Sequence, residues 1–323
     1  MVRTLRKQRW CLWFVALLAA GCANDALSGS TSSQNSLTSP EVVMLPNPSS
    51  ENALRDQFEQ IASAVQGRVG IAATKLETGE TVALNDEQQF PMQSVYKFPI
   101  AMAVLAQVDQ RRLALDQRVR VEPDDFVSEL QHSPIRDENP QGVELSLADL
   151  LRYMVVESDG TACDVLLALI GGPDVATQYL RGLGIDDIAV VNTEKEIGQD
   201  NAVQYRNYAT PQDAVALLRL LHEGQGLSDA SRALLLQLMT ETPTGPNRIK
   251  GLLPEGTPVA HKTGSSRTVD GVTAATNDVG IVTLPDGEHF AIAVFVADST
   301  ADDAARELVI AKAARAAWDT WAQ

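Results

Sequence analysis

The sequence contains few cysteines, few histidines and little positive charge. Of its 323 residues, three are cysteine and four are histidine. The chain has no Cys-x-x-Cys pair and no His-Glu-x-x-His segment, and its histidines are scattered, so the sequence predicts no metal site and no other cofactor. The formal net charge of -16 argues against a nucleic-acid partner, because the phosphates would be repelled.

Two of the three cysteines fall in an N-terminal segment that is typical of export. Basic residues precede the apolar run WCLWFVALLAAGC, which is short for a membrane span and has the form of a secretory signal. The run ends at Cys22 in LLAAGC, which resembles a bacterial lipobox, although Leu18 stands one place early. Ordinary signal cleavage nearby is the alternative. We expect residues 1–22 to be a lipoprotein-type signal and the protein to be periplasmic, with its only membrane contact through lipid on Cys22.

The rest of the chain divides into a polar tether and one globular domain. Residues 23–50 are rich in Ser, Asn, Thr and Pro, a composition that predicts a flexible tether. Because 45% of all residues are hydrophobic, the chain can bury a large core, and we expect one monomeric domain over residues 51–323. Cys163 lies in an apolar helical stretch and is expected to be an inert buried thiol.

Hydrophobic periodicity predicts an α+β fold for this domain. Strand-like segments occur in residues 51–90 and 241–323, whereas residues 91–240 have mostly helical spacing. A helix begins the domain, and an alanine-rich helix from about Asp302 to Trp321 ends it. We therefore expect one antiparallel sheet, built from both ends of the domain and flanked by these two helices, beside an all-helical subdomain.

The stretch QSVYKFPIAMAVL places a serine three residues before a lysine in an apolar helical pattern. Ser94 stands where the helix would begin, and residues three apart share a helix face, so Ser94 and Lys97 should point the same way. One interpretation is an N-cap serine and a lysine that extends to solvent. The other is a nucleophile beside an amine, because a serine hydroxyl needs an adjacent base at neutral pH.

Two further motifs follow in a fixed order. The sequence SDG at 158–160 follows a helical segment, and KTG at 262–264 lies on a predicted strand. With the SxxK at 94–97, they match the motif set of the penicillin-recognising serine enzymes. From about residue 51 to 323 the chain resembles the class A serine β-lactamases, which share the β-lactamase/transpeptidase-like fold. The strings SVYKFPIAMAVL, NTEKEIGQDNAVQYRNY and RIKGLLPEGTPVAHKTGSS resemble the PER-type extended-spectrum branch in particular.

The resemblance implies that this chain hydrolyses β-lactams through an acyl-enzyme on Ser94 and so confers resistance to them. Lys97 would be the base in its neutral form, so its pKa would have to fall below the usual value. Ser158 would pass a proton to the leaving lactam nitrogen. Backbone N–H groups of Ser94 and Ser265 would form the oxyanion hole.

The resemblance also implies a binding site for the carboxylate that β-lactams carry. Lys262 would attract this carboxylate, helped by the hydroxyls of Thr263 and Ser265. Gly264 would let its strand approach the substrate closely. Arg248 would supply a second cation, and a surface arginine is the alternative interpretation.

The chain departs from the family pattern near two of these positions. Glu194 in NTEKEIG matches the glutamate that activates the deacylating water, and Glu196 is the alternative carboxylate. The arginine and asparagine that normally flank this glutamate are replaced by Asn192 and Gly198. Gly160 stands where the family has an asparagine that contacts the active-site lysine and the substrate acylamide, so the substrate range stays open.

Three other functions are compatible with the motifs. A DD-peptidase or other penicillin-binding enzyme of the same fold would be acylated and would release the product slowly, and Glu194 argues against it. A different SxxK esterase or amidase would not form a β-lactam-derived acyl-enzyme. A non-catalytic lipoprotein that binds β-lactams is favoured by Gly160 and Gly198, but the retention of both serines, both lysines and the glutamate argues against it.

Overall fold

The computed structural model of the chain describes residues 48–322. The predicted signal, Cys22 and most of the predicted tether lie outside these residues. Helix α1 (Pro48–Ala62) begins inside the segment that was expected to be tether. Among residues 48–322, no helix combines the length and the apolarity that a bilayer span requires.

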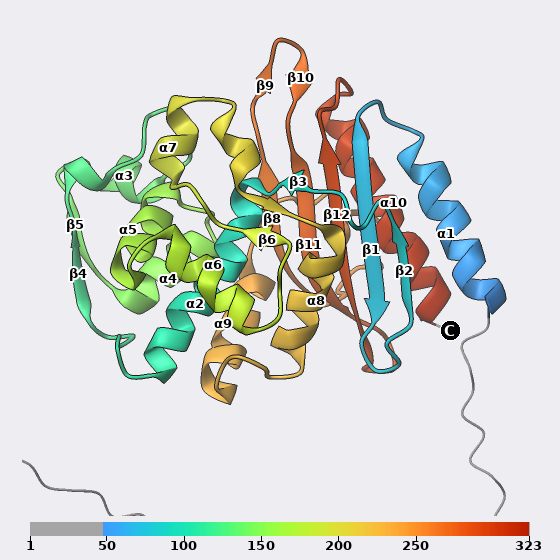
Figure 1. Cartoon of the computed structure of the whole chain (residues 1–323), viewed down its shortest axis with the longest axis horizontal. Helices are drawn as coiled ribbons and strands as arrows, with labels where there is room; N and C mark the ends of the chain where they lie inside the picture. The colour runs from blue at the N-terminus through green and yellow to red at the C-terminus, as the bar shows by residue number, and fades with distance from the viewer. Residues whose placement is uncertain (1–47, 323) are drawn as a thin grey trace, which may run out of the picture. The chain divides into compact units, whose positions relative to one another are not determined.

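A five-stranded antiparallel sheet organises the domain (Figure 1). Its strands are β1 (Arg68–Lys75), β2 (Thr81–Leu84), β8 (Val259–Ser265), β11 (Thr276–Thr283) and β12 (His289–Ala297). The strand order is β2-β1-β12-β11-β8, so strands from the two ends of the domain pair directly, β1 with β12. The prediction of an α+β fold with a composite antiparallel sheet is confirmed.

The two faces of the sheet bury different side chains. Because successive strand residues point to opposite faces, Ile71 and Val294 pack in one hydrophobic cluster while Ala72 and Phe295 pack in another. The first cluster includes buried residues of α1 and of α10 (Asp303–Trp321), which lie together on one face (Figure 1). The second cluster joins the sheet to the helical part of the domain.

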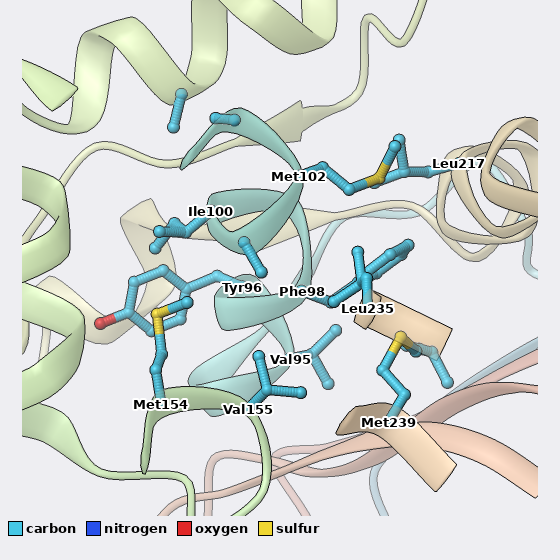
Figure 2. Packing of buried hydrophobic residues seen from close by; sticks show 14 of the residues in the cluster. Val95, Tyr96, Phe98, Ile100, Met102, Met154, Val155, Leu217, Leu235 and Met239 are labelled. Carbon is cyan, nitrogen blue, oxygen red and sulfur yellow. The ribbon is translucent and has the colours of Figure 1, made fainter. Parts of the chain in front are cut away.

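The helical part is built around α2, which is buried along most of its length. Its longer helices are α2 (Lys97–Asp109), α4 (Leu147–Val155), α5 (Gly160–Ile170), α6 (Pro173–Gly182), α8 (Pro211–His222) and α9 (Asp229–Glu241). Figure 2 shows Tyr96, Ile100 and Met102 among Met154 and Leu217 from neighbouring helices. This packing fixes the backbone that carries the SxxK motif.

Short elements border the sheet and the helices. The helical ones are α3 (Pro134–Glu138), α7 (Glu194–Gln199), η1 (Gln93–Tyr96), η2 (Pro123–Asp125), η3 (Val203–Arg206) and η4 (Ile249–Leu252). The strands are β3 (Phe90–Pro91), β4 (Arg118–Val121), β5 (Val143–Ser146), β6 (Ile188–Ala189), β7 (Tyr208–Ala209), β9 (Thr268–Val269) and β10 (Val272–Thr273). Of these, η1 packs against β8, which brings the first and third motifs together.

Candidate active site

A cleft of about 420 Å³ lies where η1, α7 and β8 meet. It is lined by most of the residues that the motifs single out: Ser94, Lys97, Ser158, Glu194, Arg248, Thr263 and Ser265. Lys262 is fully buried beside it and reaches Ser158. The structure therefore brings together three motifs that are spread over about 170 residues of the chain.

Ser94 lies in the 3₁₀ turn η1, and α2 begins only at Lys97. The Lys97 Nζ donates a hydrogen bond of 3.0 Å to Ser94 Oγ, as the three-residue spacing predicts. Lys97 is 1% exposed, and neither η1 nor α2 is capped by the Ser94 side chain. The interpretation as a capping serine with a solvated lysine is wrong.

Lys97 is paired with a carboxylate, and this pairing decides its charge. Its Nζ lies 2.8 Å from Glu194 Oε1, with both side chains almost buried. Burial is the largest single effect and lowers the pKa of Lys97. The charge of Glu194, its hydrogen bond and smaller contributions from other acidic groups together outweigh burial, so the pKa is raised above its ordinary value. The expectation that the Lys97 pKa falls is wrong for the resting site, because the paired carboxylate favours the charged ammonium.

Ser158 connects the two lysines. It has φ of 60°, a left-handed conformation that is uncommon for serine, at the turn between α4 and α5. Its carbonyl oxygen accepts a hydrogen bond of 2.7 Å from Lys97, and its Oγ accepts one of 3.0 Å from Lys262 Nζ. Burial, and next the charge of Lys97, lowers the pKa of Lys262 to about 7. Lys262 can therefore exchange a proton near neutral pH through Ser158.

The other two residues of the second motif are structural. The Asp159 carboxylate caps α5 by accepting a hydrogen bond of 2.8 Å from the backbone N–H of Ala162, and it accepts a second one of 2.8 Å from Ile135 in α3. Gly160 donates its N–H to the His132 carbonyl at 2.9 Å. A side chain at Gly160 would place its Cβ within 3.3 Å of that same carbonyl oxygen, so the loop before α3 already fills this space.

The wall formed by β8 carries the hydroxyls that were expected to bind a carboxylate. Thr263 Oγ1 shares a hydrogen bond of 2.7 Å with Thr244 Oγ1, and Arg248 donates to Ser265 Oγ at 2.7 Å. Arg248 is 8% exposed and is held by Glu307 of α10 at 3.1 Å, so the alternative of a surface arginine is wrong.

Gly264 is required by a contact within the protein. A Cβ at this position would overlap the carbonyl oxygen of Met92 and lie 3.1 Å from the backbone nitrogen of Val95. The close approach is therefore between β8 and the turn that carries Ser94. His261 points away from the cleft, as strand alternation predicts, and its Nδ1 is 2.9 Å from an oxygen of Asp278.

The two candidate carboxylates of the NTEKEIG segment have separate positions. Glu194 begins α7 and faces Lys97. Glu196 turns back and accepts hydrogen bonds of 2.9 Å from the Asn192 side chain and from the Thr193 N–H, which together close the start of α7. Asn192, which replaces the usual arginine, therefore holds this segment through Glu196. The geometry favours Glu194 as the residue that acts in the cleft.

Gln131 fills the space left by Gly198. Its Nε2 donates to the Glu194 carbonyl oxygen at 2.5 Å and lies 3.4 Å from Glu194 Oε2. A Cβ at Gly198 would overlap the Gln131 amide. Sequence reasoning missed Gln131, although the absence of a side chain at 198 signalled that another group must occupy this place.

Asp164 is a second residue that the motifs did not reveal. Its two carboxylate oxygens accept hydrogen bonds from the backbone N–H groups of Glu194, at 2.7 Å, and of Lys195, at 3.0 Å. Burial raises the pKa of Asp164 to about 6. Cys163, its neighbour in α5, is free and buried, and burial raises the pKa of its thiol well above the usual range, which suits an inert thiol.

Comparison with known proteins identifies relatives across almost the whole described chain. A family model described as the beta-lactamase enzyme family matches residues 53–321. The extended-spectrum beta-lactamase PER-1 of Pseudomonas aeruginosa is 43% identical over 269 residues, which cover 82% of this chain and 86% of that protein. Beta-lactamase VEB-1 of the same organism is 39% identical over 282 residues, which cover 86% of this chain and 93% of that protein.

Solved structures give the same result. The crystal structure of the TLA-1 extended-spectrum β-lactamase is 40% identical, with a TM-score of 0.83, and covers 85% of this chain and 100% of that one. A β-lactamase from Chitinophaga pinensis is 47% identical, with a TM-score of 0.81, and covers 83% of this chain and 99% of that one.

Proposed function

Because this chain belongs to the beta-lactamase enzyme family and is a class A β-lactam hydrolase, we propose that it opens the lactam amide through an acyl-enzyme on Ser94. The observation that carries this assignment is the continuous chain of contacts from Ser94 Oγ to Lys97 Nζ, 3.0 Å, and on to Glu194 Oε1, 2.8 Å. It links a nucleophile to a buried carboxylate that can take its proton.

In acylation, the charge state of the resting site makes Glu194 the final proton acceptor. Lys97 is an ammonium held by Glu194, so it can receive the Ser94 proton only as it passes one of its own to Glu194. Ser94 Oγ then attacks the lactam carbonyl, and the C–N bond breaks when the tetrahedral intermediate collapses. Backbone N–H groups of Ser94 and Ser265 stabilise the oxyanion, and such a donor is commonly worth about 10²–10³ in rate.

The leaving nitrogen needs a proton, and Ser158 supplies it. Ser158 Oγ accepts a hydrogen bond from Lys262 Nζ at 3.0 Å. When Ser158 gives its proton to nitrogen, Lys262 replaces it, which the Lys262 pKa of about 7 permits near neutral pH. Lys262 thus has a proton-supplying role beside its attraction for the substrate carboxylate.

The β8 wall binds that carboxylate. Thr263, Ser265 and Arg248 present two hydroxyls and a guanidinium to the same side of the cleft. Lys262 lies behind them, fully buried, and adds positive potential. Before deacylation, the proton that Glu194 took must leave the carboxylate and replace the one that Lys262 gave up, which restores the charges of the resting site. Glu194 is then the base for a water molecule, with Gln131 beside its carboxylate.

The assignment of the nucleophile is tested by intact-mass measurement with a β-lactam. Wild type should show a covalent adduct and Ser94→Ala should show none. An adduct that persists on Ser94→Ala would exclude Ser94 as the nucleophile. Slow release of the adduct by wild type would instead indicate the DD-peptidase type of activity, and an absence of adduct and turnover would indicate the non-catalytic binding protein.

We also propose that the enzyme is a periplasmic, monomeric lipoprotein, tethered through Cys22. The support is the basic start, the apolar run and the LLAAGC string. In a fractionation of cells that express the full chain, wild type should sediment with membranes and Cys22→Ser should be soluble or unprocessed. Equal membrane partition of both proteins would contradict the anchor.

A further inference from the structure

We propose that Glu77, His222 and His289 form a zinc site at the end of the sheet opposite the catalytic cleft. One ligand atom from each of these residues lies within 4.8 Å of the other two. Within residues 48–322 this is the only group of three or more histidine, cysteine or acidic side chains with such spacing. The three come from the β1–β2 turn, the last residue of α8 and the first residue of β12.

The cluster is held in place before any ion binds. The Glu77 carboxylate accepts the backbone N–H of His289, at 3.0 and 2.9 Å to its two oxygens, and lies 3.1 Å from His289 Nδ1. The rings of His222 and His289 are tilted against each other, with their centroids 4.6 Å apart. The carbonyl of His289 in turn accepts a hydrogen bond from Leu76, which fixes the turn on β12.

The donor set is that of a zinc ion with an open position. Two imidazole nitrogens and one carboxylate oxygen, completed by water, are a known zinc coordination. Ligand bonds of about 2.0–2.2 Å in a tetrahedron place the donors roughly 3.3 Å apart. The donor atoms lie within 4.8 Å of one another, and Glu77 is exposed while the two histidines are partly buried, so the side chains have room to rotate toward that spacing.

The cationic side chains around the cluster each have an acidic partner, which weakens their repulsion of a metal ion. Lys75 forms an ion pair with Glu288, with Nζ 2.6 Å from the carboxylate, and Arg219 forms one with Glu223, also at 2.6 Å. Arg232 faces the His222 carbonyl and lies 3.7 Å from Asp229, and Asp286 adds a negative charge on the β11–β12 turn. His222 also ends α8, where the helix dipole favours positive charge.

The strand register separates this site from the cleft. Ser265 pairs with Thr276, and Thr276 pairs with Val296, so the catalytic level of β12 is Val296. His289 lies seven residues earlier on the same strand, which corresponds to roughly 23 Å. Zinc here would take no part in hydrolysis and would join the β1–β2 turn, α8 and β12. The sequence pattern does not reveal this cluster, because its residues are more than 60 positions apart.

The test is zinc binding to the full chain after treatment with a chelator, followed by calorimetry and by thermal unfolding. Wild type should bind one zinc at this site and unfold at a higher temperature with zinc but not with magnesium, which prefers oxygen ligands. Loss of an outer partner of a metal site typically costs about 10–100-fold in affinity, so His222→Ala and His289→Ala should each cost at least that much.

Two controls make the result decisive. His132→Ala removes a histidine outside the cluster and should bind zinc like wild type. β-Lactam turnover without zinc should be unchanged in His222→Ala and His289→Ala, which shows that these variants are folded. Zinc binding that is equal in wild type and both variants would place the ion elsewhere, and a wild type that takes up no zinc at stoichiometric addition would overturn the site.

Discussion

At the scale of single residues, Glu194 has two roles. In the resting site its charge balances Lys97, and in the acyl-enzyme it must accept a proton from water. Glu196, two residues on, has neither contact and serves the start of α7. The two glutamates therefore form a matched pair for mutation.

We expect Glu194→Gln to be acylated and then to accumulate a long-lived adduct. Without the Glu194 carboxylate, the water that attacks the serine ester has no base, and a general base typically contributes about 10²–10⁴-fold in rate. Acylation should slow as well, because Lys97 loses its proton acceptor. Intact mass against time measures both steps. Glu196→Gln keeps an acceptor for the Thr193 N–H and should turn over substrate at nearly the wild-type rate. The reverse pattern would show that Glu196, not Glu194, is the base.

Gln131 and Gly198 should behave as one coupled pair. Gln131→Ala removes the donor to Glu194 and should lower the deacylation rate by about tenfold. This is just below the range of about 1.5–3 kcal/mol for hydrogen bonds to charged groups, because the contact is long, 3.4 Å. Gly198→Asn alone should also impair the enzyme, because its side chain collides with Gln131.

The double variant is the informative measurement. With Gln131→Ala, Gly198→Asn has room and offers an amide at the same place, so the double variant should recover part of the lost rate. Neighbouring residues that share one space are expected to be non-additive. Burst and steady-state kinetics with a chromogenic cephalosporin give the two rates, and strictly additive losses would contradict the shared-space interpretation.

At the scale of elements, the start of α7 is tied to α5 by one buried carboxylate. Asp164 accepts both free N–H groups at this end, and its pKa is raised to about 6 by burial. A group whose folded pKa lies above its unfolded value stabilises the fold most below the unfolded value, near 4. That contribution is lost as the pH rises through about 6.

We therefore expect Asp164→Asn to gain stability relative to wild type as the pH rises from about 4 to 7. A difference of about two between the folded and unfolded pKa corresponds to about 3 kcal/mol, which is the upper limit of the change. Asparagine has one acceptor oxygen where two are used, so a constant loss offsets part of the gain at every pH. Urea unfolding at several pH values gives the difference, and a difference that does not vary with pH would exclude Asp164 as the titrating group.

At the scale of the whole molecule, the sequence predicted what depends on short-range patterns. Alternation marked the strands, helical spacing marked the helical part, and the SxxK spacing placed Lys97 on Ser94. Short-range patterns could not predict contacts between distant segments. These are the pairing that keeps Lys97 charged, the Gln131 amide opposite Gly198, and the burial of Arg248 against Glu307 of α10. Each of these depends on how separately folded elements meet.

The junction between the sheet and the helical part depends on Gly264. Strand β8 packs against the Ser94 turn so closely that a Cβ at 264 would overlap the Met92 carbonyl, which is backbone and cannot rotate away. Gly264→Ala should therefore separate these elements, lower the free energy of unfolding by about 1–3 kcal/mol and slow acylation, because Ser94 and Ser265 move apart.

Gly182 is the matched control for this prediction. It ends α6, its φ is not positive, and beyond its own helix backbone and chain neighbours no atom lies within 4 Å of an added Cβ. Gly182→Ala should leave acylation unchanged and stabilise the fold by up to about 1 kcal/mol, since alanine favours helix over glycine. Urea unfolding and adduct formation are measured on both variants. If Gly264→Ala acylates and unfolds like Gly182→Ala, the junction between β8 and the Ser94 turn tolerates the added methyl group. The position of Ser94 would then be set by the packing of α2 alone.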